Sequence, residues 1–204
     1  MGRLSDLLRH QLTIAILVAL VQLGFAAFIG WFLTERWQRW RQQREFQHRT
    51  LGKFSELSYD LHNRLSELLV ARGRIKFEYR KKFDELLDRW TLFLSMRPEV
   101  IAAYGREFVL RKHYQGLITS LRALKEYVKA SEPVPTDLFE PEQDRFLAHR
   151  EAVVAEMVQA MGLLSKHDYQ AEITQSERRL ADAEVKAQKA NAQSGPATME
   201  TNRQ

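Results

Sequence analysis

The six histidines are the residues whose spacing says most about chemistry, because histidine binds metals and exchanges protons near neutral pH. They occupy positions 10, 48, 62, 113, 149 and 167, and none belongs to a His-Glu-x-x-His motif. A single Glu-x-x-His runs from Glu45 to His48. A di-iron site in a helical bundle needs a second such pair and two further glutamates on facing helices. The sequence therefore predicts no metal site.

Other catalytic signatures are also missing from the sequence. The absence of cysteine excludes disulfide scaffolds, thiolate nucleophiles and cysteine-ligated metal centres. Neither a Gly-rich phosphate loop nor a Gly-x-Ser-x-Gly elbow occurs. We therefore predict no catalytic residues and no cofactor. The alternative is an enzyme without a recognisable motif, which would need a pocket with convergent polar groups.

The composition favours helices as the elements that position the side chains. The 204 residues include only 9 glycines and 5 prolines, whereas long stretches are rich in residues that lose little rotamer freedom in a helix. We predict an all-α chain with a single N-terminal transmembrane helix, an antiparallel bundle of about four helices and a polar C-terminal tail.

Residues 11–34 form an uncharged run dominated by Leu, Ile, Val, Ala and Phe. At about 1.5 Å per residue a helix of this length reaches about 36 Å, enough to cross a hydrocarbon core of about 30 Å. A cleaved signal peptide is the alternative, because Gly24 and Ala26 flank Phe25 in a small-x-small pattern. Apolar regions of signal peptides are shorter, so we predict a transmembrane helix over 11–34 after a short tail over 1–10.

A basic segment, residues 35–50, follows the span and is predicted to be a juxtamembrane helix. Tryptophan prefers the membrane boundary, and arginine suits anionic lipid head groups. We call the predicted interface residues the collar: Trp31, Arg36, Trp37, Arg39, Trp40, Arg41 and Arg44. No nucleic-acid partner is expected, because cations this close to a bilayer already face lipid phosphates.

The distribution of charge predicts the orientation of the span. Of the net charge of +5, residues 35–53 carry +4 and residues 1–34 carry +1. Segments rich in Lys and Arg stay in the cytoplasm, so we expect the N-terminus outside and the C-terminal bundle in the cytoplasm. A bacterial inner membrane is the expected location. Arg3 and Arg9 leave the opposite topology as an alternative.

One face of the span carries small residues and one amide. Spacings of four, three, four and four residues place its members within a sector of about 80°. This small-residue stripe consists of Ala15, Ala19, Gln22, Ala26 and Gly30. Small side chains let helix backbones approach, and Gln22 can hydrogen-bond across the contact. We predict a homo-oligomer; the alternative is that Ala and Gly are simply frequent in membrane helices.

Residues 51–167 contain four apolar stripes with helical spacing, which predict a bundle. The first helix is expected to end near Gly73, the second before Pro98, the third to run from Pro98 to about residue 131, and the fourth to begin near Pro141. The stripes are Leu51, Phe54, Leu57, Leu61, Leu65 and Leu68; Ile75, Tyr79, Phe83, Leu86, Trp90 and Phe93; Leu110, Tyr114, Leu117, Leu121, Leu124 and Val128; and Phe146, Val153, Met157, Ala160 and Leu164. We expect these side chains in the core.

The C-terminal residues are more polar. Residues 168–190 carry a narrow stripe at Tyr169, Ile173, Leu180 and Ala187, and predict a weakly amphipathic helix. This helix is interpreted either as a partner-binding or coiled-coil helix or as a frayed end. Residues 191–204 are small and polar and are predicted to be disordered.

Two opposite charge clusters cancel in the total. The basic cluster, with +5, surrounds Glu78 and consists of Arg72, Arg74, Lys76, Arg80, Lys81 and Lys82. The acidic cluster, with −5, consists of Glu132, Asp137, Glu140, Glu142 and Asp144. In an up-and-down bundle both are expected at the end away from the membrane. There they either screen each other or bind a cytoplasmic protein partner.

No local string is specific enough to indicate a family, so two hypotheses are carried forward. The first is a membrane-anchored interaction or scaffolding protein. The second is a signalling or effector protein whose span self-associates and transmits a change to the bundle along a continuous helix from about Leu12 to Arg72. The second hypothesis predicts that inserting residues near Gln47 rotates the bundle and changes the output.

Overall fold

The structure is a computed structural model that describes residues 2–70, 77–129 and 136–194, with side chains described for 16–67, 81–128, 139–190 and 192. Within these ranges the chain is helical and has no strand, which confirms the all-α prediction. The helices are α1 (Gly2–Val70), α2 (Phe77–Ser95), α3 (Arg97–Tyr104), α4 (Arg106–Val109), α5 (Lys112–Lys129), α6 (Thr136–Ala160) and α7 (Lys166–Ser194). The chain divides into two compact units, Met1–Glu45 and Phe46–Gln204, which we call the N-terminal unit and the bundle unit.

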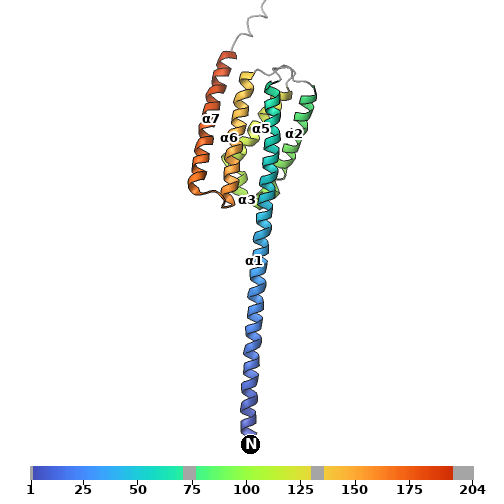
Figure 1. Cartoon of the computed structure of the whole chain (residues 1–204), viewed down its shortest axis with the longest axis vertical. Helices are drawn as coiled ribbons and strands as arrows, with labels where there is room; N and C mark the ends of the chain where they lie inside the picture. The colour runs from blue at the N-terminus through green and yellow to red at the C-terminus, as the bar shows by residue number, and fades with distance from the viewer. Residues whose placement is uncertain (1, 71–76, 130–135, 195–204) are drawn as a thin grey trace, which may run out of the picture. The chain divides into compact units, whose positions relative to one another are not determined.

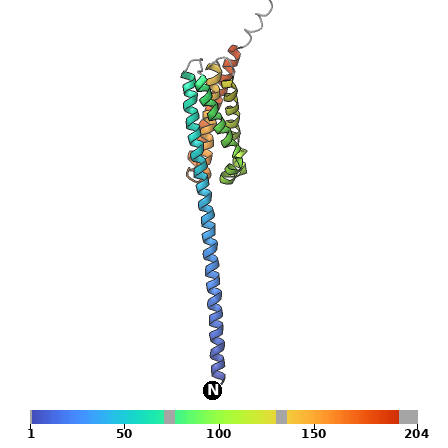
Figure 2. The same cartoon turned by 90° about the vertical axis from the view of Figure 1, so that its right-hand side faces the viewer.

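The bundle unit packs the C-terminal part of α1 with α2, α5 and α6 (Figures 1 and 2), and its core combines most of the predicted stripes with residues outside them, such as Val100 and Phe108. Burial confirms Phe54, Leu57, Leu61, Leu65, Phe83, Leu86, Trp90, Phe93, Tyr114, Leu117, Leu121, Leu124, Val128, Phe146, Val153 and Met157 as core residues. The side chains of Leu68, Ile75 and Tyr79 lie outside the described residues. Leu110 and Ala160 are exposed, so their predicted places in the core are wrong.

Trp90 lies at the centre of the core. Its indole ring makes edge-to-face contacts with Phe54 on α1, Phe93 on α2 and Phe146 on α6, at centroid distances of 5.4, 6.0 and 6.1 Å. Its Nε1–H donates to the backbone oxygen of Leu57 at 3.1 Å, so the buried polar atom of the ring is satisfied. This one side chain therefore joins three helices through apolar and polar contacts.

The predicted third helix is divided, which corrects the expectation of one helix from Pro98 to about residue 131. Gly105, at φ 90° and ψ 160°, separates α3 from α4. That left-handed φ is strained for residues with a side chain, which is why glycine suits the break. The chain bends again between α4 and α5, so Leu110 does not continue the stripe of α5 and is 55% exposed. α6 begins at Thr136 and contains Pro141, rather than starting near it.

α7 packs on α6 at the edge of the bundle (Figure 1). Its buried residues recur at spacings of three, four, three and seven, which keep them on one helix face: Ile173, Ser176, Leu180, Ala183 and Ala190. Ala148, Ala152 and Ala155 of α6 are also buried, and small side chains permit close approach of two helices. Ion pairs from Arg179 to Glu151 and from Lys186 to Asp144 link the same helices.

Two helical glycines provide a matched test of the close packing between α5 and α6. A Cβ at Gly116 of α5 would lie 2.2 to 2.6 Å from ring atoms of His149, whereas a Cβ at Gly52 of α1 meets nothing within 4 Å. We expect Gly52→Ala to stabilise the bundle by up to about 1 kcal/mol through helix propensity. Gly116→Ala should instead destabilise it by about 1 to 3 kcal/mol, because the ring must move in a filled core. Urea unfolding of both variants, followed by circular dichroism, checks the difference; equal effects would contradict the close contact.

Candidate functional site

The apolar part of α1 is the largest exposed hydrophobic surface of the described residues. Every side chain described from residue 16 to residue 34 is exposed, and the large ones include Leu20, Leu23 and Phe25 at 64 to 69%. Near the N-terminus, α1 is long and apolar enough to cross a membrane, and none of the segment that meets this test is buried. The segment is therefore not a core helix of the bundle, which would be covered by its neighbours.

The small-residue stripe lies on this exposed helix. Ala19, Gln22, Ala26 and Gly30 are exposed, while the side chain of Ala15 lies outside the described residues. A Cβ added at Gly30 would meet nothing within 4 Å. Within the part of the N-terminal unit that the structure describes, the stripe is exposed like the rest of the span, and its role in self-association stays a prediction.

Two arginines of the collar form ion pairs with glutamates that lie beside the collar on α1. Arg39 donates to Glu35 and Arg41 donates to Glu45, each one helical turn away. These pairs are exposed and contribute about 0.3 to 0.5 kcal/mol each. The guanidinium carbon of Arg44 lies 5.2 Å from the ring centroid of Trp40.

The tryptophans of the collar are open to solvent. Trp31, Trp37 and Trp40 are 53 to 60% exposed, and Arg36 is also exposed. Amphipathic rings held on the outside of a helix suit the boundary between hydrocarbon and water. The collar therefore presents Trp rings and guanidinium groups together, which is the chemistry that the sequence predicts for lipid head groups.

A buried hydrogen-bond pair joins α1 to α3 at the start of the bundle unit. Gln47, only 6% exposed, donates from Nε2 to the backbone oxygen of Ala103 at 2.9 Å. The Tyr104 hydroxyl donates to the backbone oxygen of Gln47 at 2.7 Å. Burial raises the pKa of Tyr104 to about 12, so this donor stays protonated at neutral pH. Sequence reasoning missed the pair, because Gln47 lies in a polar run that resembles the collar.

The basic cluster is only partly described. Arg72, Arg74 and Lys76, and the side chain of Arg80, lie outside the described residues. Lys81 and Lys82 are exposed near the start of α2. The start of α2 and the start of α6, which carries the described residues of the acidic cluster, lie at the same end of the bundle (Figures 1 and 2).

Two of the three acids of the acidic cluster whose side chains are described pair with other cations. Glu142 binds Arg145 within α6, and Asp144 binds Lys186 of α7. Glu132 and the side chain of Asp137 lie outside the described residues. Neither Lys81 nor Lys82 forms an ion pair with any residue that the structure describes. The described parts of the two clusters therefore do not neutralise each other through direct ion pairs.

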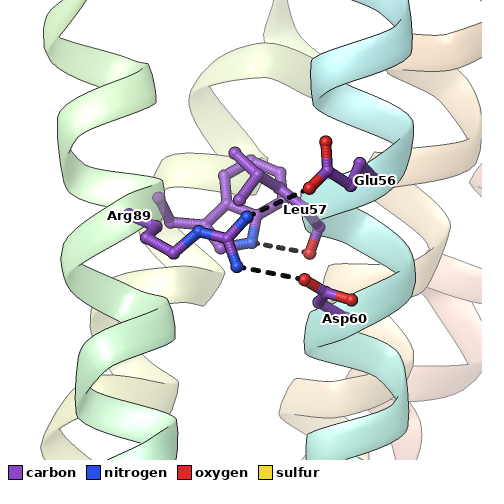
Figure 3. Close-up of polar contacts among 5 residues, drawn as sticks. Glu56, Leu57, Asp60 and Arg89 are labelled. Atoms are coloured by element: carbon purple, nitrogen blue, oxygen red, sulfur yellow. Dashed lines mark hydrogen bonds and ion pairs between the residues drawn. The ribbon is translucent and has the colours of Figure 1, made fainter.

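Arg89 of α2 forms ion pairs with two carboxylates of α1. Its guanidinium donates to Glu56 at 3.1 Å and to Asp60 at 3.2 Å, two carboxylates one turn apart on α1 (Figure 3). All three side chains are at least 40% exposed, so solvent screens the charges and each contact contributes about 0 to 1 kcal/mol. The two ion pairs help to set the register of α2 on α1.

Buried titratable groups are a second feature that the sequence did not predict. The Glu156 side chain on α6 is 5% exposed, and its Oε1 lies 4.0 Å from a guanidinium nitrogen of Arg111. Its Oε2 has no hydrogen-bond partner. Burial raises the pKa of Glu156 to about 7, against the opposing effect of Arg111. A glutamate within an amphipathic helix is normally exposed, so no pattern marks this one.

Two histidines face each other between α5 and α6. The rings of His113 and His149 lie 5.7 Å apart, and the Nδ1 atom of each is buried without a hydrogen-bond partner. Burial, His113 and nearby cations lower the pKa of His149 to about 4, and burial also lowers the pKa of His113. Both rings are therefore neutral at pH 7. Within the described ranges, no group of three or more His, Asp or Glu side chains is placed to hold a metal ion.

Comparison of the chain with protein-family models, with curated proteins and with solved structures found no match. Functional inference therefore depends on the span, the collar and the surfaces of the bundle.

Proposed function

We propose that this protein is a single-pass membrane protein that uses α1 as its anchor and its cytoplasmic helical bundle as an interaction or scaffolding module, without catalytic activity. The observation that carries the proposal is the exposed apolar surface of α1 beside the collar. Such a surface is costly in water and is covered in a bilayer. The buried core of the bundle unit is separate from that surface, so the bundle does not need the span to complete its packing.

The proposed orientation places the bundle in the cytoplasm of a bacterial cell, with the N-terminus outside the inner membrane. The charge of +4 over residues 35–53 supports this orientation, because positively charged flanks resist translocation. Alkaline phosphatase fused to the C-terminus should be inactive, and a green fluorescent protein fused there should fluoresce. Replacing the four collar arginines with Gln provides the control and should weaken the preference. Active phosphatase on the unchanged chain would contradict the orientation.

The exposed cations at the start of α2 are the proposed contact for a cytoplasmic protein. Lys81 and Lys82 are exposed, and opposite charge on a partner would steer association. A photo-crosslinking amino acid at position 82 should give discrete protein adducts in cells. The same group at Arg178, an exposed position on α7, is the control and should give none. Equal adducts at both positions, or none at either, would contradict this contact.

Self-association of the span is proposed to use the small-residue stripe. Replacing Gly30 with Leu, together with Gln22→Leu, should weaken dimerisation by up to about tenfold, because the backbones can no longer approach and the amide is lost. Gly24→Leu is a matched control, since Gly24 lies about 160° from the centre of the stripe. A reporter of transmembrane-helix dimerisation measures both. If Gly24→Leu weakens the dimer as much as the double replacement of Gln22 and Gly30, the stripe is not the contact.

The second candidate function is signalling through the span, and one observation favours it: α1 is a single helix from Gly2 to Val70. Gln47 binds within the bundle unit, so an insertion there would damage the bundle itself. The insertion is better placed between Gln42 and Gln43. Two residues rotate the following helix by about 200°, whereas seven restore the original face within about 20°. A signalling helix should lose the crosslinks at position 82 with two residues and keep them with seven; a passive anchor should keep them with both.

A further inference from the structure

A cleft of about 390 Å³ lies between α2 and α5 in the bundle unit. Its apolar lining includes Leu94 and Ile118, which are partly exposed, and Trp90 and Leu121, which are 1% and 5% exposed. Small-molecule sites typically measure about 300 to 1,000 Å³, so the volume fits a small organic molecule. The cleft draws on α2, α5 and the short helices between them, and no sequence motif indicated it.

The charged side chains that line the cleft are all cationic. They are Arg97, at the start of α3, and Arg122 and Lys125 on α5. Arg97 and Arg122 are exposed and form no ion pair with any residue that the structure describes, and Lys125 lies 3.9 Å from Asp88. Two arginines with no carboxylate beside them create a positive potential that favours an anion.

Tyr114 lines the cleft and carries a buried hydroxyl group. The residue is 1% exposed and lines the cleft, and its hydroxyl has no hydrogen-bond partner. A buried hydroxyl without a partner is unfavourable, which suggests that the group is completed by a ligand. Burial raises the pKa of Tyr114, while the charge of Arg97 acts in the opposite direction, so the hydroxyl stays protonated and can donate.

We propose that the cleft between α2 and α5 binds an amphipathic organic anion, with its phosphate or carboxylate group held by Arg97 and the Tyr114 hydroxyl and its apolar part lying along Leu94 and Ile118. Arg122 lies eight residues beyond Tyr114 on α5, about 12 Å along the helix, so it contributes through its field rather than by direct contact. This role does not depend on the proposed protein partner.

Binding is tested on the full-length chain in phosphatidylcholine nanodiscs by calorimetric titration. Hexyl phosphate carries both the anion and the apolar chain, inorganic phosphate carries the anion alone, and hexanol carries the chain alone. Hexyl phosphate should bind at one site at least tenfold more tightly than either. Binding of hexyl phosphate no tighter than that of hexanol would overturn the proposal.

The same titration in nanodiscs that contain phosphatidylglycerol distinguishes two sources of the anion. If an anionic lipid occupies the cleft, the apparent affinity for hexyl phosphate should fall at least tenfold through competition. If the natural ligand is a free organic anion, the affinity should stay the same.

Single substitutions of the lining residues test whether hexyl phosphate binds in this cleft. Tyr114→Phe and Arg97→Gln should each weaken hexyl phosphate binding about tenfold, and Arg122→Gln about twofold to threefold, since charge-assisted hydrogen bonds are stronger than long-range attraction. Arg178→Gln on α7 removes the same charge elsewhere and should bind like the unchanged chain. Tyr114→Phe should unfold at the same or a higher temperature, because its hydroxyl has no partner in the free protein. Unchanged binding by both Tyr114→Phe and Arg97→Gln would overturn the proposal.

Discussion

Replacing Trp90 with alanine is expected to destabilise the bundle by about 4 to 5 kcal/mol. The ring is 1% exposed and contacts aromatic residues on three helices, so its removal leaves a cavity that the core cannot easily fill. The hydrogen bond to the Leu57 carbonyl, worth about 1 kcal/mol, is lost as well. Urea unfolding of the full-length chain in nanodiscs, followed by far-ultraviolet circular dichroism, measures the change.

Two further variants make this prediction specific. Trp90→Phe keeps part of the ring but loses the donor, and should cost about 2 kcal/mol. Leu92→Ala is the control on the same helix, because Leu92 is 64% exposed, and its effect should stay within about 0.5 kcal/mol. A loss below about 1.5 kcal/mol for Trp90→Ala would contradict its central place in the core.

Replacing Glu156 with glutamine is expected to change how the stability of the bundle depends on pH. The pKa of Glu156 is raised from 4.5 to about 7. Between pH 4.5 and pH 7 this carboxyl group is therefore protonated in the folded chain and ionised in the unfolded chain. Stability therefore falls as pH rises from 4.5 to 7 and stays reduced above it. Glutamine removes this loss, so at pH 8 the variant should be more stable by up to about 3 kcal/mol.

His149 has the opposite effect on how the stability of the bundle depends on pH. Its pKa is lowered from 6.5 to about 4, so between these values the unfolded chain binds the extra proton. Stability contributed by the neutral ring is complete above pH 6.5 and is lost as pH falls toward 4. Between pH 4.5 and 6.5 the two contributions oppose each other in the unchanged chain.

The free energy of unfolding of Glu156→Gln should therefore rise by about 3 kcal/mol from pH 4 to pH 6.5, whereas that of the unchanged chain should vary much less. Urea unfolding at half-unit steps of pH measures both curves. Glu126→Gln on α5, an exposed position, is the control and should not raise the stability at pH 8. Parallel curves for Glu156→Gln and the unchanged chain would contradict the burial of this carboxyl group.

The apolar stripes show what can be read from local spacing. Phe54, Leu61, Phe83 and Leu117 lie in the core because a helix repeats every 3.6 residues, and this period depends only on residues within a turn or two. The prediction that Leu110 lies in the core is wrong because the backbone changes direction beside it. Its spacing matches α5, but the breaks at Gly105 and before α5 change the direction of the chain, and the stripe alone cannot locate them.

Polar residues show the limit of the same reasoning. Gln47, Glu156 and His149 resemble exposed residues in sequence, and each is removed from solvent by helices that are distant along the chain. The cleft between α2 and α5 has the same origin, because Arg97, Tyr114 and Arg122 come from two helices and meet only when those helices pack beside α2. Desolvation by distant neighbours has no local period, so it cannot be read from spacing.

Local patterns are sufficient to predict the helical class, the apolar segment that is long enough to cross a membrane and most of the core. These features depend on composition and on periodicity within single helices. Only the packed fold shows where the third predicted helix breaks, that α7 packs on α6, which polar groups are buried and which cations line the cleft. Those features depend on contacts between helices, whose relative positions are set by packing across the whole bundle.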